Sequence, residues 1–309
     1  VDLTGGRGDA LVRAAAPLNE RTALELAGAW LAEEERAVWE GGRLRTERLR
    51  RLGAITLATT PGPPPGPAQV AGAVVAQVRA EGADAGLDVL PWDEEARGLR
   101  ARLALLHEHL GEPWPDMSDA ALAERAEEWL APAVMSLVGQ SGGSASSGSG
   151  GRRFSLERLD VTQALRALLP WPQAARLDAL VPERLEVPSG SQVRVDYTAM
   201  VGGAAGAAGS AGSAVSADAG RAGRPVLAVR VQECFGWAAT PRIVEGRVAV
   251  LLHLLSPARR PVAVTDDLAS FWEQGYPQVR AEMRGRYPKH AWPEDPWNAP
   301  ATRGTGRRR

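Results

Sequence analysis

The sequence predicts an α+β protein in three parts: a small β-rich N-terminal unit, a helical connector and a mixed β/α C-terminal domain. Strand-like segments separated by glycines predict the first part. Apolar residues at helical spacing between residues 68 and 138 predict the second. Alternating apolar and polar residues from Gln192 to Tyr197, with helical spacing after Pro261, predict the third.

The expected boundaries follow segments rich in proline, glycine, serine or alanine. A Pro/Gly segment at 61–67 and a Ser/Gly segment at 140–151 are typical of linkers. We therefore expect a β-rich unit at 1–60, a helical connector at 61–138, a flexible linker at 139–153, a C-terminal domain at 154–298 with a low-complexity insertion at 199–224, and a basic tail at 299–309.

The β-rich unit is predicted to begin with a capped helix. Asn19 can accept a backbone hydrogen bond at the start of a helix that runs through Ala29. This helix would offer Leu24, Leu26 and Trp30 to a core. The strands expected after it are Val38 to Trp39, Arg43 to Leu52 and Ala54 to Ala58, with a hairpin turn at Gly41 and Gly42.

Three amphipathic helices are expected in the connector, with Asp93 and Ser118 as N-caps. Their apolar faces carry Val70, Val74 and Val78, then Leu99, Leu103, Leu106 and Leu110, then Leu122, Trp129 and Leu130. His107 and His109 could suggest a metal site. Two residues apart on a helix, however, they point about 200° apart, so we expect surface residues and no metal ligands.

In the C-terminal domain, the apolar run from Val248 to Leu255 is typical of a strand buried on both faces. Thr265 or Asp266 can cap the helix that follows. Cys234 has apolar neighbours and no histidine nearby in the sequence to activate it. We therefore predict a packed thiol and no catalytic residue.

The overall composition limits the class of protein. Net charge is −1, but it runs from −8 over residues 1–135 to +5 over residues 241–309. No apolar run approaches the roughly 20 residues that span a bilayer, so no membrane partner is expected. A lone cysteine and no visible secretory signal fit a cytoplasmic protein.

Two basic clusters are candidates for nucleic-acid binding. The first comprises Arg43, Arg45, Arg48 and Arg50. Strand alternation puts Arg43 and Arg45 on one face and Arg48 and Arg50 on the other. They either follow phosphates along a groove or form a solvated strand whose charge Glu33, Glu34 and Glu35 balance.

The second cluster comprises Arg280, Arg284, Arg286 and Lys289, interleaved with Tyr276, Tyr287, Trp292 and Trp297. Aromatic side chains stack on bases or fill a core, and arginine binds phosphate or carboxylate. Composition alone does not show which of these roles the aromatic residues and the arginines have. We favour packing for the aromatic residues, with RNA contact or docking onto another domain as the alternative for the cations.

Four long strings carry a family resemblance: VPSGSQVRVDY, PVLAVRVQECFG, VLLHLLSPARRPVAVTDDLASFW and RGRYPKHAWPEDP. They resemble the C-terminal domain of the bacterial HrpB-type ATP-dependent helicases, a branch of the DEAH-box RNA helicases. The resemblance implies that residues 1–60 end a barrel like the oligonucleotide-binding (OB) fold. It also implies motor domains upstream in the same parent chain and single-stranded RNA as partners.

The motor itself is not expected in this chain. A phosphate-binding loop of the form GxxxxGK[ST] needs a lysine, and the single lysine, Lys289, is followed by His290. We thus expect an accessory C-terminal region that guides nucleic acid or stabilises the motor, with no ATPase site. ATP and Mg²⁺ would bind only in the absent motor domains. The alternative is a structural or protein-interaction module without nucleic-acid contact.

Overall fold

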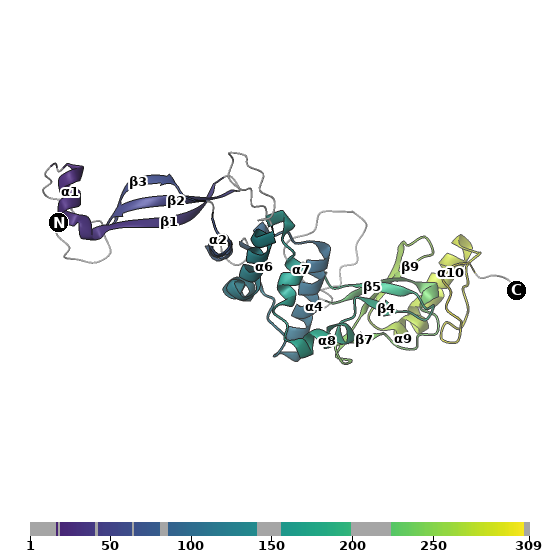
Figure 1. Cartoon of the computed structure of the whole chain (residues 1–309). Helices are drawn as coiled ribbons and strands as arrows, with labels where there is room; N and C mark the ends of the chain where they lie inside the picture. The colour runs from purple at the N-terminus through teal and green to yellow at the C-terminus, as the bar shows by residue number, and fades with distance from the viewer. Residues whose placement is uncertain are drawn as a thin grey trace, which may run out of the picture. The chain divides into compact units, whose positions relative to one another are not determined.

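The computed structural model describes residues 17, 19–40, 43–63, 65–80, 86–140, 156–198 and 224–305. The chain divides into two compact units, Val1–Ala76 with Val134–Arg158, and Gln77–Ala133 with Leu159–Arg309. Helices and separate sheets occur along the chain, as Figure 1 shows, so the predicted α+β class is confirmed. None of the helices in the described ranges is both long enough and apolar enough to span a bilayer.

The first unit contains a three-stranded antiparallel sheet with the order β1-β2-β3 (Figure 1). Its elements are α1 (Glu20–Ala27), the 3-10 turn η1 (Gly28–Trp30), β1 (Leu31–Glu40), β2 (Arg43–Leu52) and β3 (Ile55–Pro61). The Asn19 side chain accepts a hydrogen bond from the Thr22 amide at 2.9 Å, so the predicted cap is confirmed. Gly41 and Gly42 lie outside the described residues.

Two predictions for this unit are wrong. The first strand begins at Leu31, seven residues earlier than expected, because glutamates in β1 lie opposite arginines in β2 and cross-strand attraction offsets their poor strand propensity. Leu26 and Trp30 are 76% and 70% exposed, so they do not enter a core. Of the described side chains in the three strands, Thr46 alone is buried.

The connector helices follow the predicted apolar spacing. They are α2 (Pro67–Ala80), α4 (Glu94–Leu110), α5 (Asp119–Glu124) and α6 (Ala126–Gln140). Asp93 and Ser118 accept hydrogen bonds from the Ala96 and Ala121 amides, which confirms both N-caps. The third predicted helix is broken at Arg125, which ends α5. Every predicted apolar residue is buried except Leu110, which is half-buried.

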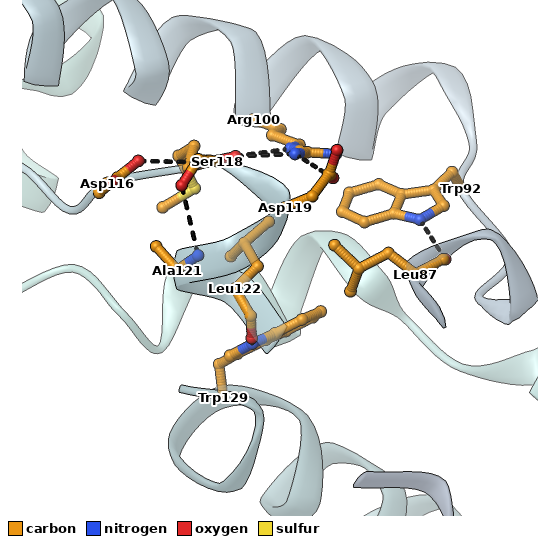
Figure 2. Close-up of polar contacts among 10 residues, drawn as sticks. Leu87, Trp92, Arg100, Asp116, Ser118, Asp119, Ala121, Leu122 and Trp129 are labelled. Carbon is orange, nitrogen blue, oxygen red and sulfur yellow. Dashed lines mark hydrogen bonds and ion pairs between the residues drawn. The ribbon is translucent and has the colours of Figure 1, made fainter. Parts of the chain in front are cut away.

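Arg100 joins α4 to the segment before α5 (Figure 2). Its Nε and Nη2 atoms donate to the Met117 carbonyl at 3.0 and 2.8 Å, and Nη2 lies 2.6 Å from an Asp119 carboxylate oxygen. The guanidinium also lies 5.3 Å from the centre of the Trp92 ring, within cation–π range. Trp129 completes the junction by donating to the Leu122 carbonyl.

A second arginine, Arg102, is almost fully buried between α4 and the start of the C-terminal domain. Its Nε donates to the Val181 carbonyl at 2.7 Å, and its Nη1 donates to Glu183 at 3.0 Å. Asp178 accepts a further hydrogen bond from Nη2. Arg102 therefore ties the connector to the last turn of α8 and the segment after it.

The C-terminal domain is built on a mixed five-stranded sheet with the order β10-β9-β6-β5-β4. The preceding helices are α7 (Val161–Arg166), which lies against α4 (Figure 1), and α8 (Trp171–Leu180). The strands are β4 (Arg184–Glu186), β5 (Gln192–Asp196), β6 (Val226–Arg230), β9 (Leu251–Leu255) and β10 (Pro261–Thr265). Among these five described strands, β6 and β9 are the pair that runs in parallel.

Parallel pairing needs a crossover, and here it carries the small hairpin β7 (Arg242–Ile243) and β8 (Val248–Ala249). The predicted continuous strand from Val248 to Leu255 is therefore divided at Val250, whose amide donates to the Pro241 carbonyl. At the hairpin turn, the buried Val244 has a φ of 53°. Its amide donates to the Leu180 carbonyl, which holds the hairpin against α8.

The last helical segment has three parts: α9 (Leu268–Ser270), a π-helical turn η7 (Phe271–Gly275) and α10 (Tyr276–Arg286). Asp267 is the N-cap in place of the expected Thr265 or Asp266; its side chain accepts from the Ser270 amide. Gly275 is required in the π turn, because a Cβ there would lie 2.7 Å from the Phe271 ring.

Aromatic residues around this turn form one part of the buried core of the domain. The Trp272 ring lies 5.1–6.0 Å from the rings of Phe235, Phe271 and Tyr276. Its indole nitrogen donates to the Trp237 carbonyl at 2.8 Å, and the Tyr276 hydroxyl donates to the Pro293 carbonyl at 3.0 Å. Both polar groups are thus satisfied inside an apolar cluster.

Candidate nucleic-acid interface

The predicted arginines of β2 lie beside glutamates of β1. Arg48 and Arg50 face Glu35 and Glu33 in the strand register. Arg48 Nη2 lies 3.2 Å from Glu35 Oε1, and Arg51 Nη1 lies 3.2 Å from Glu34 Oε2. Arg43 and Arg45 belong to β2, but their side chains lie outside the described residues. The facing carboxylates reduce the positive charge that this strand presents.

The predicted cations at the end of α10 are in two situations. Arg280 has a structural role, since its Nε donates to the Trp292 carbonyl at 3.0 Å and its Nη2 lies 2.8 Å from Glu294. Arg284, Arg286 and Lys289 are exposed and form no ion pair among the described residues. Two residues apart on the helix, Arg284 and Arg286 point in opposite directions, so this cluster does not form one surface.

The aromatic residues interleaved with these cations are mainly packed, as favoured from the sequence. Tyr276 and Trp292 are buried, and Tyr287 and Trp297 are half-buried. The Trp292 indole donates to the Tyr287 carbonyl at 3.0 Å. Burial lowers the pKa of His290, and the positive charge of Arg230 lowers it further. His290 therefore favours its neutral form near pH 7.

The lone cysteine and His107 each have a packed or hydrogen-bonded environment. Cys234 is buried, and burial followed by the nearby Glu233 charge raises the pKa of its thiol. The predicted packed thiol is thus confirmed. His107 Nδ1 lies 2.8 Å from the Trp114 carbonyl oxygen. In the part of the chain that the structure describes, no three His, Cys, Asp or Glu residues are grouped to hold a metal.

Five arginines line a pocket that sequence reasoning missed. It has a volume of about 600 Å³ and opens on the C-terminal sheet. Its five arginines, which we call the arginine pocket, are Arg184, Arg194, Arg230, Arg259 and Arg303. Glu233 is the one acidic residue among the described residues that line it. The five arginines are separated by up to 119 positions, so no local motif marks them.

Comparison with known proteins agrees with this architecture. The family model described as an ATP-dependent helicase C-terminal domain, HrpB_C, matches residues 148–296. The ATP-dependent RNA helicase HrpB of Escherichia coli K12 is 37% identical over 265 residues, which cover 85% of this chain and 28% of the relative.

Two solved structures are similar as well. A crystal structure of the E. coli DExH-box NTPase HrpB has a TM-score of 0.65 at 33% identity. The match covers 93% of this chain and 31% of the solved chain. A crystal structure of the E. coli DEAH/RHA helicase HrpB has a TM-score of 0.58 at 33% identity. That match covers 85% of this chain and 29% of the solved chain. This chain therefore spans less than a third of the relatives that it matches.

The mixed sheet and its aromatic helix lie within residues 148–296, which match the helicase C-terminal domain family. Residues 148–296 belong to the C-terminal domain family of the HrpB-type helicases, and the chain as a whole corresponds to the C-terminal part of such a protein. The resemblance found in the sequence strings is confirmed.

Proposed function

We propose that this chain is the accessory C-terminal region of an ATP-dependent RNA helicase, where it guides single-stranded RNA or stabilises the motor. The observation that carries the proposal is the match of residues 148–296 to the helicase C-terminal family. Arg284, Arg286 and Lys289 at the end of α10 are exposed, so each can attract a phosphate singly although they do not share one surface. In the parent protein, the upstream motor domains would be its partner.

In this proposal ATP and Mg²⁺ bind in the motor, because the single lysine of this sequence does not lie in a P-loop motif. Lys289 follows Pro288 and precedes His290 in a turn after α10, with no glycine-rich loop around it. A nucleotide site of the P-loop kind needs a lysine at the end of such a loop, together with backbone amides that hold the phosphates. No step of ATP hydrolysis is therefore assigned to this chain.

The first prediction is that the isolated chain binds single-stranded RNA with a strong dependence on salt. Neutralising phosphates releases counterions, so log K should fall linearly with log salt concentration, by about 0.7 for each phosphate contacted. Fluorescence anisotropy of a labelled oligoribonucleotide between about 50 and 200 mM salt measures this slope. Absence of binding at the lowest salt would overturn RNA guidance.

That negative result would favour the alternative, a protein-interaction module. The exposed apolar side chains Leu26, Trp30 and Ile55 of the first unit give this alternative some support. Apolar groups of this size gain free energy when a partner covers them. Binding of purified motor domains to the chain without RNA would then identify the interaction.

The second prediction is that the chain alone does not turn over ATP, with or without RNA. The expected result is a rate equal to the buffer blank in a phosphate-release assay, because the chain provides no lysine in a phosphate-binding loop. A full-length HrpB-type helicase in the same assay is the positive control. Turnover that follows this chain through purification would contradict the proposal.

A further inference from the structure

We propose that the arginine pocket binds the phosphate backbone of a single nucleic-acid strand, independently of its base sequence. This inference rests on the proposed function, since it identifies where the RNA is held. The pocket lies on the β4-β5-β6 side of the C-terminal sheet, with Gln192, Arg194, Ala228 and Arg230 among its lining residues. Ala228 is exposed although β6 is a central strand, so a small side chain leaves the recess open.

The strand register places two positive charges directly opposite each other. Arg184 of β4 pairs with Arg194 of β5. Like charges at opposed positions of an antiparallel pair destabilise it, and a bound anion between them would remove that repulsion. Arg194 Nη1 also lies 2.5 Å from Glu94, but both side chains are more than half exposed. Such an exposed ion pair is weak, so a phosphate can replace the carboxylate.

The opposite wall of the arginine pocket is held in place by backbone contacts. Arg230 Nη1 donates to the Arg303 carbonyl at 2.7 Å, and Arg303 Nε donates to the Ser189 carbonyl at 2.9 Å. Gly190, with a φ of 75°, permits this contact, because a Cβ there would lie 2.9 Å from Arg303 Nη2. Each guanidinium has five N–H donors, so donors remain on both arginines for a ligand.

The one acidic residue among the described lining residues, Glu233, offsets the charge of one pocket arginine, Arg230. Glu233 is buried, accepts a hydrogen bond from the Ser189 hydroxyl at 3.0 Å and lies 3.8 Å from Arg230 Nε. Glu233 thereby holds Arg230 and Ser189 in place, and most of the positive charge of the arginine pocket remains uncompensated. Arg259, at the β9–β10 turn, is exposed and forms no ion pair in the described part of the chain.

The chemistry of the lining selects the ligand class. Planar guanidinium groups bind phosphate oxygens through two parallel hydrogen bonds. The described residues that line the pocket include no aromatic side chain on which a base could stack. Stacking and base-edge contacts provide sequence preference in single-strand recognition. The strand is therefore expected to bind through its backbone alone.

The test compares two double variants of the whole chain. Arg194→Gln with Arg259→Gln removes two exposed charges from the pocket. The matched control, Arg97→Gln with Arg176→Gln, removes two exposed charges from α4 and α8, which do not line it. The match extends to partners: Arg176, like Arg194, pairs with an exposed glutamate, whereas Arg97, like Arg259, forms no ion pair among the described residues.

The measurement is anisotropy of fluorescein-labelled oligouridylate and oligoadenylate across a salt series. The pocket variant is expected to bind roughly tenfold more weakly at low salt, and its log–log slope should be shallower by about 1.4, or two phosphate contacts. The control should keep the wild-type slope, and the two oligonucleotides should bind equally. Circular dichroism spectra identical to wild type exclude unfolding of the variant.

The possible outcomes separate this inference from the proposed function. RNA binding by the wild type that the pocket variant retains in full would overturn the pocket assignment and leave RNA guidance standing. Equal loss in both double variants would also overturn it, since binding would then follow total charge. No binding by the wild type would overturn both proposals. If inorganic phosphate displaced the oligonucleotide at a concentration equal to that of the oligonucleotide's own phosphate groups, the pocket would be assigned to a small anion instead.

Discussion

Replacing Trp272 with alanine is expected to lower the free energy of unfolding of the second unit by about 3–5 kcal/mol. Trp272 is 2% exposed and lies at the centre of the aromatic cluster. The substitution removes its contacts with Phe235, Phe271 and Tyr276 and leaves a cavity in their place. It also leaves the Trp237 carbonyl without the indole donor.

Urea unfolding followed by circular dichroism measures this loss as a lower midpoint of the second unit's transition. Trp272→Phe should show a smaller loss, about 1–2 kcal/mol, because it keeps a ring but not the hydrogen bond. The matched control is Trp171→Ala, since Trp171 is 84% exposed at the start of α8. Equal losses at Trp272 and Trp171 would contradict this account of the core.

Replacing Arg102 with methionine is expected to lower the free energy of unfolding of the same unit by about 3 kcal/mol. Methionine preserves most of the apolar stem, so the loss comes from hydrogen bonding. The buried Val181 loses the donor to its carbonyl, and Glu183 and Asp178 lose theirs. Replacing both partners of a buried ion pair by apolar groups can leave the free energy of unfolding unchanged. The Val181 carbonyl belongs to the backbone, however, so no substitution removes it, and it loses its donor.

Substituting the acidic partners of Arg102 should lower the free energy of unfolding much less than substituting Arg102 itself. The side chains of Asp178 and Glu183 are largely exposed, so Asp178→Asn and Glu183→Gln should each cost less than about 1 kcal/mol. Arg97→Met, an exposed position on the same helix, is the control. A larger effect at Asp178 than at Arg102 would show that the ion pair, and not the carbonyl contact, holds the connector.

Local signals were enough to predict most of the helices and most of their caps. The capping of α4 by Asp93 and of α5 by Ser118 depends on residues three positions apart, which a sequence shows directly. The spacing of Leu99, Leu103 and Leu106 likewise identifies the buried face of α4. The alternation in β5 is equally local, and that strand appears where it was expected.

Pairings between distant segments could not be predicted in this way. Strand β1 forms because its glutamates meet the arginines of β2, although glutamate on its own disfavours strands. The run from Val248 to Leu255 divides because its second half pairs in parallel with β6 across a crossover. The arginine pocket depends on the opposed register of Arg184 and Arg194, which composition does not reveal.

The π turn at Phe271–Gly275 sets the rotational phase of everything after it. An α-helix advances about 100° for each residue, so one extra residue in a turn rotates the remainder of the helix by about that angle. Tyr276 and Met283 thereby face inward, while Arg284 and Arg286 face solvent. Shortening this segment by one residue would swing Tyr276 out of the core and Arg280 away from Glu294, whereas substitutions within it would alter only nearby contacts.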